Sequence, residues 1–293
     1  MKVLVTGGTG FIGDALCREL DDRGHEVTAM SRSPDDSDLP GSVETVSGDL
    51  TNYAAVEELF DGADAVYNLV ALSPLYQTRG DRTHERVHLE GTENAVRAAE
   101  EAGVSRFVQL SALGADPDGA TAYIRAKGEA EAVVRESDLD WTIFRPSVVF
   151  GDGGEFIPFT KKLTTPYVTG LPGGGRTRFQ PIYRGDMVEI LADGLAEEHA
   201  GETYEIGGPE TLTLAEVTKL AYRAEGKSVS ILPIPMPLAS IGLTLAGPLP
   251  FVPFGPDQAR SLRFDNTTAE NDVGAFGLDA GDLTTLSEYL GLK

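Results

Sequence analysis

The chain has 293 residues, and its hydrophobic fraction of 41% is typical of a globular protein and excludes a disordered one. Its 46 acidic and 24 basic residues give a net charge of −22, and so acidic a surface would repel nucleic acid, which excludes DNA or RNA as an expected partner. The single cysteine, Cys17, excludes an internal disulfide and is expected to be a packed core thiol.

The acidity has two interpretations that the sequence leaves open. It is either an adaptation of the surface to high salt, where screening removes self-repulsion, or the charge that keeps an ordinary acidic protein soluble. Met1-Lys2 leads directly into an apolar run without the pattern of a signal peptide, so we expect a cytoplasmic protein.

Short apolar runs alternate with stretches of helical spacing over the first 150 residues. The runs predicted as strands are 2–6, 25–30, 65–70, 107–110 and 141–144. The stretches predicted as helices are 11–23, 54–60, 82–102 and 121–137, with Gly24 and Gly103 as helix stops. Strands without polar alternation are typical of a sheet covered on both faces, so we expect an α/β fold with a doubly wound parallel sheet, a Rossmann domain over 1–150.

After residue 150 the pattern changes to glycine-rich loops and shorter elements. Residues 203–206 and 229–234 are predicted strands, and 213–225 is a predicted helix that Thr213 and Glu216 would open as a capping box. We therefore expect 151–293 to form a smaller α+β substrate or partner lobe, interleaved with the sheet.

Residues 228–256 contain no charged side chain and seven prolines. The proline-free part, 238–246, is a candidate short helix, but it is too short to span a bilayer. The segment is either a buried crossing of the small lobe or an apolar lid or interfacial surface, which would contact a lipophilic ligand, a membrane or a membrane complex.

A glycine-rich turn follows the first predicted strand. Gly7, Gly10 and Gly13 occupy the three glycine positions of a dinucleotide fingerprint, which allow a tight turn, close approach to a pyrophosphate and close helix packing. The N-terminus of the following helix would point its N–H groups at the phosphates. The predicted phosphate-binding residues are Gly7, Thr9, Gly10, Phe11, Ile12 and Gly13.

Ser31 and Arg32 follow the second strand, where NAD-selective sites usually carry an acid. Arg32 can pair with a 2′-phosphate, so NADP(H) is favoured over NAD(H); the alternative is a solvated arginine paired with Asp35 or Asp36. Two further contacts are expected. Asp49-Leu50 would lie at the adenine, and Val70-Ala71 at the nicotinamide ribose.

Ser111 follows the strand 107–110, and Tyr123 and Lys127 share one face of the next predicted helix. Lys127 would bind the nicotinamide ribose and lower the pKa of Tyr123 by its charge, so that Tyr123 could transfer a proton while Ser111 holds a carbonyl or alcohol oxygen. No metal is expected, because His25, His84, His88 and His199 do not have ligand spacing.

These motifs, in this order, resemble the extended or atypical branch of the short-chain dehydrogenase/reductase superfamily. The resemblance includes residues 145–151, Arg-Pro-Ser-Val-Val-Phe-Gly, and it implies that Pro146 and Val148 also contact the cofactor. Residues 111–116, 180–183, 204–210 and 265–266 are similar to the subgroup of the nucleotide-binding accessory subunit of respiratory complex I. That similarity implies a tightly held NADP(H) and leaves catalysis open.

One position departs from the superfamily pattern. Residues 87–92 place His88 where an asparagine often supports a proton-relay water. The leading hypothesis is an NADP(H)-dependent oxidoreductase that acts on a small, apolar carbonyl or alcohol substrate. The alternatives are a non-catalytic nucleotide-binding subunit of a complex-I-like membrane complex and a sugar-nucleotide epimerase or dehydratase. The sequence does not predict an oligomeric state.

Overall fold

The computed structural model describes residues 1–34, 37–78, 80–235 and 255–292. The described chain divides into two compact units. Unit 1 contains residues 1–72, 78–145 and 187–204, and unit 2 contains residues 73–77, 146–186 and 205–293. The predicted boundary near residue 150 stays a prediction, and the candidate helix 238–246 lies outside the described residues.

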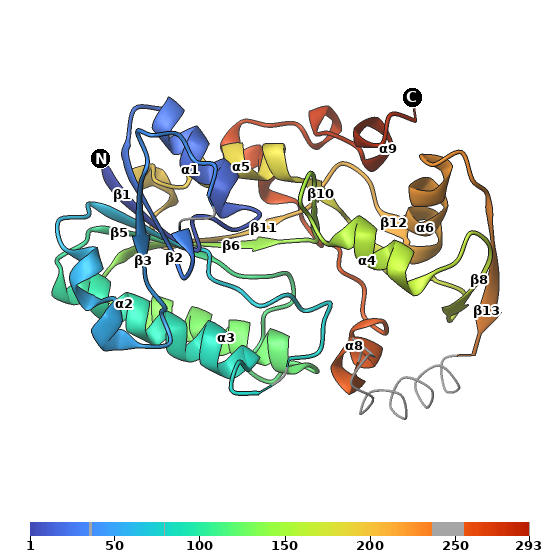
Figure 1. The fold of residues 1–293 in the computed structure, drawn as a ribbon, viewed down its shortest axis with the longest axis horizontal. Helices are drawn as coiled ribbons and strands as arrows, with labels where there is room; N and C mark the ends of the chain where they lie inside the picture. The colour runs from blue at the N-terminus through green and yellow to red at the C-terminus, as the bar shows by residue number, and fades with distance from the viewer. Residues whose placement is uncertain (35–36, 79, 236–254, 293) are drawn as a thin grey trace. The chain divides into compact units, whose positions relative to one another are not determined.

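The central sheet has seven strands in the order β11-β6-β5-β4-β1-β2-β3 (Figure 1). The neighbouring strands β6, β5, β4, β1, β2 and β3 all pair in parallel, which confirms the predicted doubly wound α/β fold. The strands are β1 (Lys2–Thr6), β2 (Glu26–Ser31), β3 (Glu44–Ser47), β4 (Ala65–Asn68), β5 (Arg106–Leu110), β6 (Asp140–Pro146) and β11 (Glu202–Ile206).

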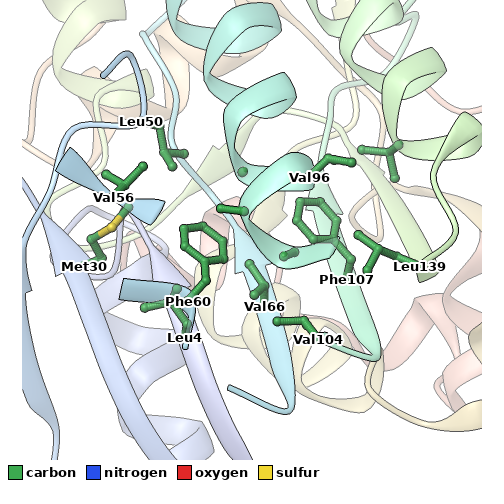
Figure 2. Packing of buried hydrophobic residues seen from close by; sticks show 14 of the residues in the cluster. Leu4, Met30, Leu50, Val56, Phe60, Val66, Val96, Val104, Phe107 and Leu139 are labelled. Carbon is green, nitrogen blue, oxygen red and sulfur yellow. The ribbon is translucent and has the colours of Figure 1, made fainter. Parts of the chain in front are cut away.

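Helices cover both faces of this sheet: α2 and α3 lie side by side on one face, and α1 lies on the other (Figure 1). They are α1 (Gly13–Asp22), α2 (Gly91–Glu101), α3 (Ala122–Glu136) and α5 (Arg184–Asp193). An apolar cluster fills much of the core between the sheet and α2, and Phe60, Val66 and Phe107 meet there at 0% exposure (Figure 2). Cys17 is buried, as expected.

Two predicted helices differ from the structure. Residues 54–60 form two 3-10 turns, η2 (Tyr53–Ala55) and η3 (Glu57–Phe60). Residues 82–102 form a π-helical turn, η4 (Glu85–Glu90), that continues into α2. A π-turn contains one residue more than an α-turn, and such turns are frequent at functional sites.

Unit 2 is built from shorter elements. Its helices are α4 (Phe156–Leu163), α6 (Leu214–Arg223), α8 (Pro256–Ser261) and α9 (Leu286–Tyr289), with 3-10 turns η6 (Asp272–Phe276) and η7 (Ala280–Asp282). Its strands form three pairs, β7 (Val149–Phe150) with β10 (Ile182–Tyr183), β9 (Arg178–Phe179) with β12 (Leu212–Thr213), and β8 (Tyr167–Pro172) with β13 (Val229–Ile234). The predicted capping box of Thr213 and Glu216 is present at the start of α6.

Candidate functional site

The glycine turn after β1 has the conformation that its sequence predicts. Gly7 has φ +75°, and its N–H donates to the Met30 oxygen at 2.8 Å. A Cβ at Gly13 would lie 2.1 Å from the Gly7 oxygen, so α1 begins in direct contact with the turn. Only glycine fits here, and the first turn of α1 supplies the backbone donors with which helix N-termini bind phosphate groups.

The turn also touches the end of β4. A Cβ at Gly7 would lie 3.2 Å from the Val70 nitrogen, and the Leu69 N–H donates to the Thr6 oxygen at 3.1 Å. The structure therefore brings the predicted phosphate residues and the predicted ribose segment, Val70 and Ala71, to one edge of the sheet. This is the carboxyl edge of the strands, where ligands bind in open α/β folds.

Two predicted adenosine contacts have different surroundings. The Ser31 Oγ atom is buried and has no hydrogen-bond partner among the described residues, while Arg32 beside it is exposed. Asp49 already accepts from the Thr51 N–H and hydroxyl, at 3.0 and 2.8 Å, and Leu50 is a core residue. The Ser31 hydroxyl is thus available to a polar ligand, whereas Asp49 already caps a local turn. Asp35 and Asp36, the alternative partners of Arg32, lie outside the described residues.

Lys127 is placed at the end of β5 by helix α3. Its Nζ atom donates to the Leu110 oxygen at 2.7 Å, and the residue is only 3% exposed. Burial lowers the pKa of Lys127 to about 8, because an ammonium loses hydration there. The helix comes this close because Gly128 lies against the 112–119 loop, where a Cβ would be 2.3 Å from the Asp116 carbonyl carbon.

Tyr123 lies one helical turn before Lys127, in contact with two histidines. The centroid of its ring is 5.4 Å from those of His84 and of His88, both edge-on. Burial raises the pKa of Tyr123, and no charge lowers it. The sequence predicts that the charge of Lys127 lowers the pKa of Tyr123. In the structure the loss of hydration dominates and raises this pKa instead, so the phenol stays protonated at neutral pH.

His88 is 1% exposed, and its Nε2 atom accepts from the Leu72 N–H at 3.3 Å. Burial and the nearby charge of Lys127 hold the pKa of His88 well below its usual range, so the ring is neutral. With Nε2 accepting, the proton is assigned to Nδ1, which is buried and has no hydrogen-bond partner among the described residues. The position that departs from the superfamily pattern is thus in direct contact with Tyr123.

The Ser111 hydroxyl is engaged by a residue that the sequence analysis did not single out. Its Oγ atom donates to Glu131 Oε1, and Glu131 is 1% exposed. Arg145 binds the same carboxylate at 2.9 and 2.6 Å, and Arg135 binds it at 2.8 Å. The signal that could have found Glu131 is its spacing, since it continues the series of Tyr123 and Lys127 by four residues along one helix face.

A buried chain of hydrogen bonds joins the glycine turn to Lys127. The Thr6 hydroxyl donates to Asn68, the Asn68 amide donates to Gln109 at 2.9 Å, and the Gln109 amide donates to the Leu110 oxygen that Lys127 also binds. Each link is buried, so the chain stabilises the relative placement of β1, β4 and β5 at the site. Gln109 lies within a buried strand, and no local sequence signal marks its side chain as part of the site.

The remaining predicted residues are placed as follows. Thr9, Gly10, Phe11 and Ile12 lie in the glycine turn before α1, whereas Pro146 and Val148 belong to unit 2, so their cofactor contacts stay predictions. Among the described residues no cluster of His, Cys, Asp or Glu has the arrangement of a metal site. None of the described helices is long and apolar enough to cross a membrane.

Comparison with known proteins identifies relatives of this chain. Residues 7–177 match the model of an NAD(P)H-binding family. A mitochondrial NADH dehydrogenase [ubiquinone] 1 alpha subcomplex subunit 9 from Arabidopsis thaliana is 28% identical over 94% of this chain and 73% of its own length. A 3-beta-hydroxysteroid dehydrogenase from Mycolicibacterium neoaurum is 31% identical over 78% of this chain and 71% of its own length.

The 40 kDa subunit of NADH-ubiquinone oxidoreductase from Neurospora crassa is 30% identical over 75% of this chain, which spans 59% of that subunit. Among solved structures, a nucleoside-diphosphate-sugar epimerase from Staphylococcus aureus covers 100% of both chains with a TM-score of 0.76 and 18% identity. At that identity the likeness establishes the fold alone.

Proposed function

This chain belongs to the NAD(P)H-binding, extended short-chain dehydrogenase/reductase-like family, and on that premise we propose that it is an NADP(H)-dependent oxidoreductase for a carbonyl or alcohol group of an apolar substrate. The observation that carries the proposal is the placement of buried Lys127 at the end of β5, one helical turn after Tyr123, in the unit that holds the glycine turn. The nicotinamide would supply or accept a hydride, and the protein would supply the proton and the orientation.

Each residue has a proposed role. Tyr123, protonated because its pKa is raised, donates to the substrate oxygen and delivers its proton as hydride arrives. Lys127 binds the nicotinamide ribose. Ser111 donates to a carbonyl oxygen of the substrate only if its hydroxyl turns away from Glu131, which costs about 1.5–3 kcal/mol for a hydrogen bond to a charged group. Tyr123 is therefore the main contact of that oxygen.

Tyr123→Phe tests this assignment. We expect NADPH oxidation with a panel of apolar ketones and aldehydes to fall at least about a hundredfold, the usual loss for a general acid, with NADPH affinity unchanged. Tyr53→Phe, which removes an exposed hydroxyl bonded to Glu101, is the matched control and should keep full activity. Equal turnover in Tyr123→Phe and wild type would refute the role of Tyr123.

Arg32 and Ser31 are the proposed binders of the adenosine 2′-phosphate. Arg32→Ala should weaken NADPH binding by about tenfold, since one charge-assisted contact is lost, and should leave NADH binding nearly unchanged. Titration of the fluorescence of each reduced nucleotide measures both affinities, with Arg223→Ala as the control for loss of an exposed arginine. A parallel loss for both nucleotides would contradict the preference for NADP(H).

A second candidate is a nucleotide-holding subunit of a membrane complex. It is favoured by the similarity to the Arabidopsis subunit, which is 28% identical over 94% of this chain. It is also favoured by the hydrogen bond that the Ser111 hydroxyl donates to Glu131. Purification with bound NADPH and with membrane-complex subunits, and without turnover on any carbonyl of the panel, would support this candidate over the first. Sugar-nucleotide chemistry has support from the fold alone.

A further inference from the structure

The charge of this chain is unevenly distributed. Acidic residues make up 46 of the 293, yet none occurs in residues 156–185 or 226–256. The first segment carries five basic residues, and Lys227 is the only charged residue of the second. These two segments contain β8 and β13, which pair with each other in unit 2.

The β8–β13 pair has one buried face and one exposed apolar face. Thr169 and Leu171 on β8 and Val229 on β13 are buried. The alternate positions are open, and Val168, Leu232 and Ile234 are 52%, 55% and 36% exposed. The alternation follows from the two-residue period of a strand. Ile234 lies over Gly170, whose added Cβ would be 2.6 Å from the Ile234 Cδ1 atom, so the two strands are in contact on the exposed face. Ser230, in register with Val168, is the polar position of this otherwise apolar face.

An aromatic residue and lysines lie at the amino end of the same strands. Tyr167 is 64% exposed and takes φ +71°, an uncommon backbone conformation for a bulky residue. Its N–H donates to the Ser228 oxygen, which places Lys227 beside it. Lys161 and Lys227 both bind Glu225, at 2.6 and 2.7 Å, so this carboxylate faces two ammonium groups.

Lys162, next to Lys161 on α4, is exposed and lies 5.5 Å from the centre of the Tyr76 ring. Lys161 and Lys227 thus share Glu225, while Lys162 lies at the Tyr76 ring, on which the charge of Glu155 also acts. Three lysines are set against two carboxylates here, so the local charge is positive in a chain of net charge −22. An apolar surface bordered by an exposed tyrosine and lysines fits the interface of a bilayer, where apolar groups enter the acyl boundary and lysines meet headgroups.

We propose that the exposed β8–β13 face, made of Val168, Leu232 and Ile234 and bordered at its amino end by Tyr167, docks unit 2 on the surface of an anionic lipid bilayer, with Lys161, Lys162 and Lys227 at the headgroups. The proposal holds whether or not the nucleotide site turns over, because both functions proposed above are compatible with a peripheral membrane protein. An uncharged bilayer would gain only the apolar contacts, so anionic lipid should bind more tightly.

Flotation with vesicles of phosphatidylglycerol and phosphatidylcholine tests this docking, at the lowest salt in which circular dichroism shows the full chain folded. We expect wild type to float with anionic vesicles and less with pure phosphatidylcholine. Leu232→Asp with Ile234→Asp should reduce binding at least about tenfold, since two apolar contacts are replaced by charges. Lys161→Gln, Lys162→Gln and Lys227→Gln should each reduce anionic binding roughly fivefold.

Two variants of unit 2 are the matched controls. Lys219→Gln removes an exposed lysine of α6, and Phe264→Asp removes an apolar side chain that is 56% exposed outside the β8–β13 face; both should bind like wild type. Absence of wild-type binding to anionic vesicles, or equal binding by the double aspartate variant, would overturn the proposal. So would a lipid-free dimer that the same two aspartates dissociate, because the face would then bind a second copy of the chain.

Discussion

Lys127 is a charged group held almost out of contact with water. Its ammonium donates to the Leu110 oxygen, and its pKa falls to about 8 from the ordinary value of 10.5. A protonated lysine at this depth is costly, so the protein sacrifices stability at neutral pH to keep a cation beside the end of β5. Such a cost is typical of residues retained for function rather than for folding.

The pH dependence of stability should reveal this cost. Because the folded pKa lies below the unfolded one, the unfolded chain binds more protons between pH 8 and 10.5, and the free energy of unfolding rises with pH in that window by up to about 3 kcal/mol. Below pH 8 the cost is present in full. As the pH rises from 7 to 10, the free energy of unfolding of the wild type should therefore increase relative to that of Lys127→Met.

Urea titrations at each pH measure this difference. Lys2→Met, which removes a lysine whose side chain is 59% exposed, should show no comparable trend. A pH-independent difference for Lys127→Met would mean that the ammonium is well solvated in the folded protein.

At the scale of elements, sequence reasoning succeeded where one local signal decides the structure. The glycine turn, the capping box of Thr213 and the strands β1 and β13 were predicted at their observed positions because glycine geometry, a cap or an apolar run fixes each one. Residues 54–60 were predicted as a helix because apolar spacing does not distinguish an α-turn from consecutive 3-10 turns. The pairing of β8 with β13 joins segments sixty residues apart and leaves no local pattern.

Only part of the candidate site was predicted, again because local signals can be read from the sequence and contacts between distant segments cannot. Tyr123, Lys127 and Ser111 carry a known spacing, and the structure places Lys127 and Ser111 together at the end of β5. Glu131 and Gln109 were missed because their roles depend on partners from other elements. The pKa of Tyr123 was predicted in the wrong direction because burial of the ring can be seen only in the folded structure.

The first glycine of α1 gives a test at this scale. Gly13→Ala would bring a Cβ to 2.1 Å from the Gly7 oxygen and 2.8 Å from the Gly8 Cα atom, so the turn must move. We expect a loss of about 1–3 kcal/mol in unfolding free energy, the usual cost of overpacking, and at least tenfold weaker NADPH binding. Gly41→Ala, where an added Cβ meets nothing within 4 Å, is the control for the same chemical change and should be neutral.

At the scale of the whole molecule, the net charge of −22 should make stability depend on salt. Screening weakens repulsion among the carboxylates, so we expect the midpoint of thermal unfolding to rise by several degrees between about 0.1 M and 2 M KCl. Sucrose at matched osmolality controls for the general stabilising effect of excluded solutes. If sucrose and KCl raise the midpoint equally, the acidic surface is not an adaptation to high salt.

The π-turn of Glu85–Glu90 has a consequence for how this region tolerates changes in length. It holds one residue in excess of a regular α-helix, so a deletion of Arg86 would restore the α-helical repeat and leave the residues on both sides of the turn nearly in place. His84 and His88 should then both stay at the Tyr123 ring. A deletion variant thus offers a way to ask what the extra residue contributes without separating the two imidazoles from the phenol.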